Sequence, residues 1–144
     1  MEELLEEIKD VKLHSSTAIL IATLFGGPLA AGYLMMENYQ NLGDRDAASK
    51  ALIYGIVGTV ALFGLILLIP ESVMEVIPTP AISIASVIGI RAIVEQKLGE
   101  TLKEHKANDK AFYSRWRALA VGLICLLIIS AVTLSAVFLF IGIE

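Results

Sequence analysis

The sequence predicts an all-α polytopic membrane protein, a four-transmembrane-helix bundle with a kinked first helix and an amphipathic N-terminal helix. Three observations support this prediction. Of the 144 residues, 56% are hydrophobic and 18% are charged, whereas about a quarter of a soluble domain is charged. The mean hydropathy is +0.75. The apolar residues also fall into four blocks, each near the roughly 20 residues that a helix needs to cross a bilayer.

The first 14 residues favour an amphipathic helix that precedes the membrane part. Apolar side chains recur on one face and acidic side chains on the other, although Leu13 does not fit this stripe. The acidic start of the chain is unlike the basic start of a secretory signal peptide. The apolar face comprises Leu4, Leu5, Ile8 and Val11.

The first predicted span covers residues 17–36, which carry no charge. At its centre, Pro28 removes a helix hydrogen bond and its ring clashes with the Leu24 carbonyl, while Gly26 and Gly27 soften the turn. We prefer one kinked helix that crosses completely, because spanning helices tolerate helix breakers. The alternative is a re-entrant hairpin of two short arms, which would keep the N-terminus in the cytoplasm.

Three further spans complete a single membrane domain over residues 1–144. Residues 51–70 and 118–142 carry no charge. The span over residues 77–95 is weaker, because it reaches spanning length only by including Arg91 and Glu95, which are placed to pair at i,i+4. A buried or re-entrant helix is the alternative for this segment.

The third helix is expected to continue beyond the membrane as an amphipathic extension, because apolar residues recur along it at helical spacing. Asn108 and Asp109 favour an N-cap for the last helix. The apolar residues of the extension are Ile90, Ile93, Val94, Leu98 and Leu102.

The distribution of basic residues predicts the topology. Of the 11 lysines and arginines, two lie in residues 37–50 and seven in residues 91–117, whereas residues 71–78 contain none. The positive-inside rule therefore places loops 37–50 and 91–117 in the cytoplasm, and four full spans place both termini outside. The second cytoplasmic loop also contains an interfacial basic-aromatic segment, made of Arg91, Tyr113, Arg115, Trp116 and Arg117.

Small residues at four-residue spacing predict close helix packing, as small-xxx-small faces do in membranes. We interpret them as contacts within one bundle. The alternative is that one stripe remains free for a homo-oligomer. The candidate packing residues are Ala18, Ala22, Gly26, Ala30, Gly55, Ala85, Gly89 and Gly122.

Several function classes are unsupported by the residues present. No charged residue or histidine lies at mid-membrane depth in any predicted span, although such residues mark ion-coupled transport. Cys125 is the only cysteine, and His14 and His105 are expected to be solvated. A net charge of −4 disfavours nucleic acid. We therefore expect no enzyme activity, no catalytic residue, no metal and no cofactor.

Three stretches, residues 26–33, 38–43 and 112–118, carry a resemblance. Together they resemble a group of small uncharacterised bacterial four-helix integral membrane proteins. The resemblance implies a multi-pass protein of the bacterial inner membrane, and it implies no activity or site residue.

Two functions remain open. The first is a structural or regulatory role that acts through helix packing and a basic cytoplasmic face. Its partners would be membrane lipids and either further copies of the chain or another membrane protein. The second is a channel or facilitator for a small solute or ion, because a helix break at mid-membrane depth exposes backbone groups. The residues of this second site would be Leu24, Gly26, Gly27 and Pro28.

Overall fold

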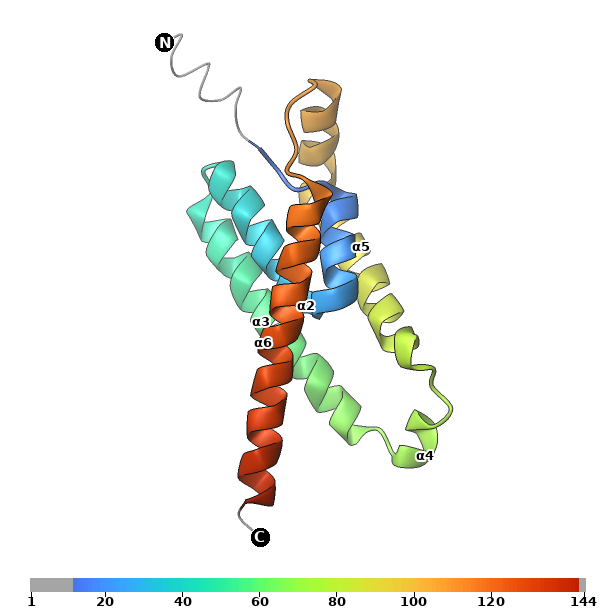
Figure 1. The fold of residues 1–144 in the computed structure, drawn as a ribbon. Helices are drawn as coiled ribbons and strands as arrows, with labels where there is room; N and C mark the ends of the chain where they lie inside the picture. The colour runs from blue at the N-terminus through green and yellow to red at the C-terminus, as the bar shows by residue number, and fades with distance from the viewer. Residues whose placement is uncertain (1–11, 143–144) are drawn as a thin grey trace.

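The computed structural model describes residues 12–142, and its regular elements are helices joined by short connections (Figure 1). The prediction of an all-α protein is confirmed for this part of the chain. Most of the predicted N-terminal amphipathic helix lies outside the described residues. The helices are α2 (Ser16–Asn41), α3 (Arg45–Leu68), the short α4 (Glu71–Met74), α5 (Thr79–Ala107) and α6 (Arg115–Ile141).

By length and composition alone, with α2 counted as one helix of 26 residues, three of these helices, α2, α3 and α6, are long and apolar enough to span a membrane. This finding supports a membrane protein with transmembrane helices. The helix α5 covers the predicted third span, but it does not reach the same combination of length and hydropathy within the described residues. Its composition explains the difference, because the second half of α5 carries charged residues at short intervals.

The helix α2 is a hairpin of two arms, residues 16–26 and residues 28–41. Gly27 between them has φ 64° and ψ −158°, a backbone region that is essentially restricted to glycine. A continuous helix of 26 residues would be about 39 Å long, yet the chain turns at Gly27 and returns to the end from which it came (Figure 1). The break therefore lies where the sequence predicts it, and α2 has the two-armed shape of the hairpin alternative instead of the preferred shape, one kinked helix.

Side-chain caps fix where the helices begin. Ser15 accepts a hydrogen bond from the Ala18 N–H at the start of α2, and Asp44 accepts one from the Ala47 N–H at the start of α3. The predicted N-cap at Asn108 is wrong, because this residue ends α5. The last helix begins only at Arg115, after a short extended segment.

That extended segment pairs with the segment that precedes α2. Leu13 and Phe112 form an isolated parallel bridge, in which the Tyr113 N–H donates to the Leu13 carbonyl at 2.9 Å. The pairing draws a loop from the C-terminal half of the chain across the open end of the α2 hairpin.

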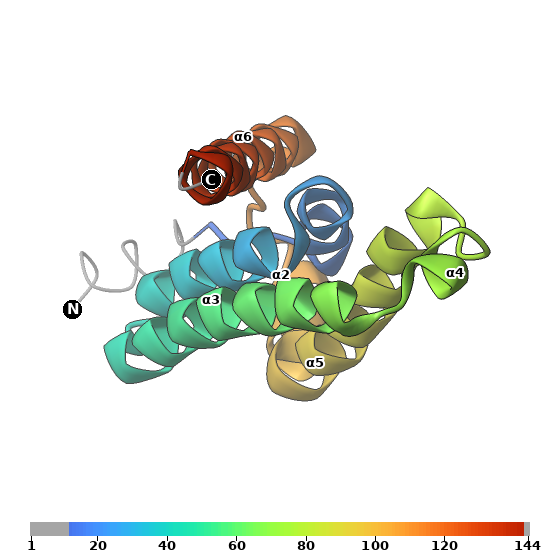
Figure 2. The ribbon, with the colours of Figure 1, turned by 90° about the horizontal axis from the view of Figure 1, so that it is seen from below.

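The hairpin lies at the centre of the molecule, and α3, α5 and α6 surround it (Figure 2). Each of these three helices packs on α2, whereas no close packing joins any two of them within residues 12–142. The arrangement is therefore centred on one element, unlike a bundle in which each helix contacts its neighbours around a ring.

The buried core lies at the level of the hairpin. The predicted extension of α5 contributes to it through Val94, Leu98 and Leu102, which are almost completely buried, while Ile93 is exposed. The apolar stripe of α5 thus packs on the protein itself. The other large members of the core are Leu13, Ile19 and Leu34.

Beyond the tip of the hairpin, α3 and α6 continue without a partner among residues 12–142. We call residues 59–68 and 126–141 the outer halves of these helices. Most of their apolar side chains are exposed, with Leu67 at 85% and Phe138 at 74%. The packed part of the molecule is therefore confined to one end, as Figure 1 also shows.

Candidate functional site

Small residues bring the first arm of α2 against α6. A Cβ placed on Gly122 would lie 2.9 Å from the Ala22 carbonyl oxygen, and one placed on Gly26 would lie 2.9 Å from the Cβ of Cys125. No real Cβ tolerates such a distance, so the two backbones approach as closely as glycine permits. This contact fixes the depth that the hairpin tip reaches along α6.

The second arm of α2 approaches α3 in the same way. A Cβ on Gly32 would lie 2.7 Å from the Gly55 Cα and 2.8 Å from the Ala51 carbonyl oxygen. Gly32 was not among the predicted packing residues. Its importance comes from its position opposite Gly55, which is visible only once the two helices are paired.

The other predicted packing residues divide into two groups. Ala18, Ala22 and Ala30 are completely buried, and Gly26, Gly55 and Gly122 lie in the contacts described above. Ala85 and Gly89 are exposed, and a Cβ on Gly89 would meet no atom within 4 Å. The expected packing role of these two residues is not what the structure shows, because α5 packs through a different face.

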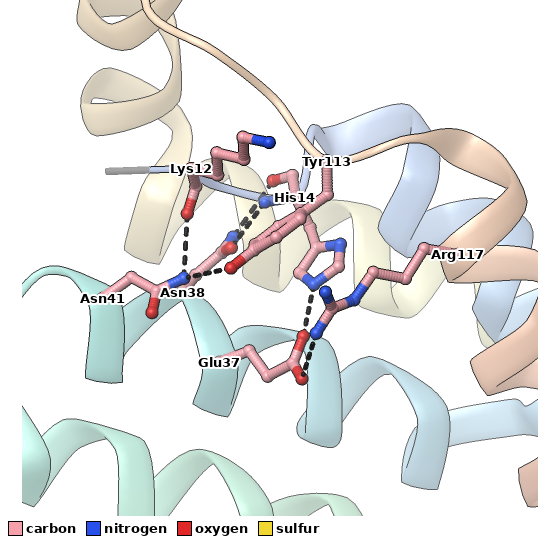
Figure 3. A network of polar contacts seen from close by, with 7 residues as sticks. All are labelled: Lys12, His14, Glu37, Asn38, Asn41, Tyr113 and Arg117. Carbon is pink, nitrogen blue, oxygen red and sulfur yellow. Dashed lines mark hydrogen bonds and ion pairs between the residues drawn. The ribbon is translucent and has the colours of Figure 1, made fainter. Parts of the chain in front are cut away.

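A network of polar contacts closes the open end of the hairpin (Figure 3). It joins the segment before α2, the end of α2 and the start of α6. We call it the polar clamp. Its members are the Lys12 carbonyl group, His14, Glu37, Asn38, Asn41, Tyr113 and Arg117.

The buried part of the clamp is a reciprocal pair between His14 and Asn38. The His14 N–H donates to Asn38 Oδ1 at 2.6 Å, and Asn38 Nδ2 donates to the His14 carbonyl at 3.0 Å. Both residues are completely buried. The nearby Asn41 donates to the Lys12 carbonyl at 2.8 Å in a more exposed position.

The charged part of the clamp is centred on Glu37. One of its carboxylate oxygens contacts His14 Nε2, and the other accepts from Arg117 Nη2 at 3.2 Å. The Arg117 guanidinium lies over the Tyr113 ring at 4.3 Å, and this ring stacks on the His14 ring at 4.6 Å. Four side chains from three segments therefore form one stacked and paired unit.

Burial lowers the pKa of His14, although the hydrogen bond with Glu37 opposes this shift. The geometry assigns the neutral tautomer that donates from Nε2 to Glu37, because a carboxylate only accepts. The other ring nitrogen, Nδ1, is buried and has no hydrogen-bond partner among residues 12–142. A proton on Nδ1 would consequently remain unsatisfied.

The expectation that both histidines are solvated is wrong. His14 is completely buried and His105 is 6% exposed. His105 Nε2 lies 2.6 Å from the Ala111 carbonyl oxygen, and its ring packs against the edge of Phe112. Both rings support the loop that connects α5 to α6.

The predicted basic-aromatic segment separates in space. Tyr113 and Arg117 belong to the polar clamp, whereas Arg115 and Trp116 are exposed at the start of α6. Arg91 is exposed and pairs with Glu95 at 3.1 Å, which confirms the predicted i,i+4 pair.

A groove of about 420 Å³ lies beside the hairpin. The second arm of α2 forms its floor, and α3 and α5 form its walls. We call it the lateral groove. At its end near the polar clamp it is lined by Tyr39, Lys50 and Lys97, and its inner end reaches Pro28 and Gly58.

The predicted helix-break residues lie at the tip of the hairpin. Gly26 is buried against α6, Pro28 lines the lateral groove, and Leu24 is 45% exposed. A Cβ on Gly27 would meet no atom within 4 Å, so this glycine is needed for its backbone angles. Within residues 12–142, no group of three histidine, cysteine or acidic side chains is placed to hold a metal ion.

Comparisons of the chain with protein-family models, with curated proteins and with solved structures find no match.

Proposed function

We propose that the chain is a multi-pass inner-membrane protein with a structural or regulatory role, and that α2 is a re-entrant hairpin rather than a span. The arms of α2 are about 17 Å and 21 Å long at 1.5 Å per residue, and the hydrocarbon core is about 30 Å thick. Neither arm is long enough to cross, whereas α3 and α6 are. The helix α5 would complete a third crossing, with its Arg91–Glu95 pair at the interface.

The close contacts support a hairpin tip near the bilayer midplane. Cys125, which faces the tip at Gly26, follows the first residue of α6 by ten positions, or about 15 Å of helix. That is half of the hydrocarbon thickness. The backbone groups freed at Gly27 would then be shielded by α6 and α3, as re-entrant segments require.

The hairpin also accounts for the distribution of the basic residues between the two sides of the membrane. With both ends of α2 at the clamp end, the N-terminus and the loops over residues 37–50 and 91–117 share one side. Every lysine and arginine of the chain then lies in the cytoplasm or at its interface. The C-terminus lies outside, together with the loop over residues 71–78.

One observation carries the structural or regulatory role: the outer halves of α3 and α6 are apolar and have no protein partner within residues 12–142. Contiguous apolar surface of this extent marks a contact with lipid or with other transmembrane helices. We propose that these outer halves receive helices of a second copy or of another membrane protein, and that the basic face remains available in the cytoplasm.

A channel or facilitator is the second candidate. The lateral groove reaches Pro28, beside the helix break, which favours a midplane site. The arrangement of the helices around α2 argues against a channel within one chain, because α3, α5 and α6 do not pack on one another in the described part of the chain and so do not form a closed ring. A pore would therefore need several copies.

Site-specific labelling tests the proposed placement. In a Cys125→Ala background, single cysteines at Ser49 and Ser72 should react from opposite sides of the membrane, and an N-terminal tag should share the side of Ser49. A tag on the side of Ser72 would overturn the hairpin placement.

A flux assay separates the two functions. Purified protein in liposomes should pass neither small ions nor small neutral solutes above the rate of empty liposomes. A flux that increases with the amount of protein in the liposomes would contradict the structural role and support the channel. The mass of the complex in a mild detergent then reports whether copies associate.

A further inference from the structure

The lateral groove is the feature that helix packing leaves unexplained. Its volume of about 420 Å³ lies within the range of small-molecule sites, roughly 300–1,000 Å³. Its walls α3 and α5 are not packed on each other, so the groove opens sideways, between two helices. In the membrane placement proposed above, this opening would face the bilayer.

The two ends of the groove differ in chemistry. The inner end is lined by Pro28, Gly58 and Gly89, none of which carries a charged side chain. The end near the polar clamp is lined by two lysines, Lys50 on α3 and Lys97 on α5. From Lys50 to Gly58 the wall extends about 12 Å at the helical rise, so a bound molecule would be elongated.

The two lysines are available to a ligand. Lys50 pairs with Asp46 at 3.1 Å, but both side chains are mostly exposed, and such pairs on a helix surface are weak. Lys97 has no ion pair within residues 12–142. Each wall of the groove therefore contributes one lysine at this end.

We propose that the lateral groove binds an anionic phospholipid of the cytoplasmic leaflet. The phosphate group lies between Lys50 and Lys97, and an acyl chain extends along the apolar wall toward Pro28. Basic pockets between transmembrane helices on the cytoplasmic side bind anionic headgroups in this way. The inference rests on the membrane placement proposed above.

The charge and the elongated shape of the lateral groove favour a lipid as its ligand, instead of a helix from a partner protein or from a second copy of the chain. An apolar transmembrane helix would bring no negative charge to the two lysines. A phospholipid carries both the anion and the apolar chain, in the order in which the groove presents its basic and apolar ends.

The experiment measures lipid retention. The protein is reconstituted in vesicles of equal parts phosphatidylglycerol and phosphatidylcholine with identical acyl chains, extracted in a mild detergent and examined by native mass spectrometry. Each lysine near an anionic headgroup is worth about fivefold in affinity, so the wild type should retain phosphatidylglycerol over phosphatidylcholine by at least about tenfold.

Two variants test the two ends separately. Lys50→Gln with Lys97→Gln should remove the preference, and its matched control is Lys103→Gln with Lys106→Gln, which makes the same charge change outside the groove. Gly89→Phe should reduce retention of both lipids, because its side chain enters open space in the groove. Its control is Gly64→Phe, where a Cβ also meets no atom but which does not line the groove.

Equal retention of the two lipids by the wild type would overturn the proposal, as would a preference that survives loss of both lysines. The groove would instead be assigned to a second copy of the chain if the wild type forms a dimer that retains no lipid and the Gly89→Phe variant is monomeric. Failure of the membrane placement would appear instead in the labelling of Ser49, Ser72 and the N-terminal tag, so the two results are distinguishable.

Discussion

Asn38 binds both backbone groups of His14, through a 2.6 Å bond from the His14 N–H and a 3.0 Å bond to the His14 carbonyl. The two residues are 24 positions apart and lie at opposite ends of α2 in the chain. Their side-by-side position requires the chain between them to reverse. The pair thus closes the hairpin that Gly27 opens.

Asn38→Ala should lower the free energy of unfolding by about 2–5 kcal/mol. The substitution leaves a buried N–H and a buried carbonyl without partners, and each such group costs roughly 1–3 kcal/mol. The measurement is denaturant or thermal unfolding in detergent. Asn41→Ala is the matched control, because its bonds are more exposed, and it should cost clearly less. Equal losses for the two variants would show that the buried pair has no special role.

Stability should fall as the pH is lowered below about 6.5, the ordinary pKa of histidine. Burial lowers the pKa of His14 in the folded protein, so the unfolded chain binds more protons in this range. The contribution of His14 is therefore complete above its unfolded pKa and is lost as the pH falls toward the folded value.

Melting temperatures at pH 7.5 and pH 5.5 measure this effect. His14→Gln keeps a donor toward Glu37 and does not titrate, so it should reduce the difference between the two temperatures. A pH dependence of the same size in His14→Gln would assign it to other groups.

Gly32→Ala should destabilise the protein by about 1–3 kcal/mol, the usual range for overpacking. The new Cβ would meet the backbone of Gly55 and Ala51 at 2.7–2.8 Å, and neither can yield without separating α2 from α3. Gly64→Ala is the matched control, because its Cβ meets no atom within 4 Å. It should be neutral or slightly stabilising, since alanine favours a helix over glycine.

Gly27→Ala should destabilise the hairpin by roughly 1–3 kcal/mol although the new methyl group touches nothing. The cost comes from the backbone, because φ 64° with ψ −158° strains any residue with a Cβ. Gly99→Ala, inside α5 with only ordinary Cβ contacts, is the control and should not destabilise. If Gly27→Ala unfolds like the wild type, the turn does not depend on these angles.

The position of the break in α2 can be predicted from the sequence, but its shape cannot. Gly26, Gly27 and Pro28 weaken a helix at one point, and a kink and a reversal share this local pattern. The difference lies in contacts between His14 and the end of α2, which no periodicity reports. The local pattern alone therefore favours a kinked helix, whereas the contacts of the whole fold form the hairpin.

The burial of the histidines also depends on contacts between residues far apart in the chain, which the local sequence does not report. His14 stands in a polar stretch that gives no sign of a core. It is buried because Tyr113, 99 positions later, stacks on its ring. The apolar blocks and the Arg91–Glu95 pair were predictable, because hydropathy and i,i+4 spacing are local properties.

The central position of α2 has a consequence for the order of biosynthesis. The second arm of α2 and α3 are neighbours in the chain, so the Gly32–Gly55 contact becomes available soon after both are synthesised. The first arm instead depends on Gly122, which is 100 positions after its contact Ala22. The face of the first arm that contacts α6 remains uncovered until α6 leaves the ribosome. Translation that stops after α5 would therefore yield a chain whose hairpin is covered on only part of its surface, and the arrival of α6 covers the first arm.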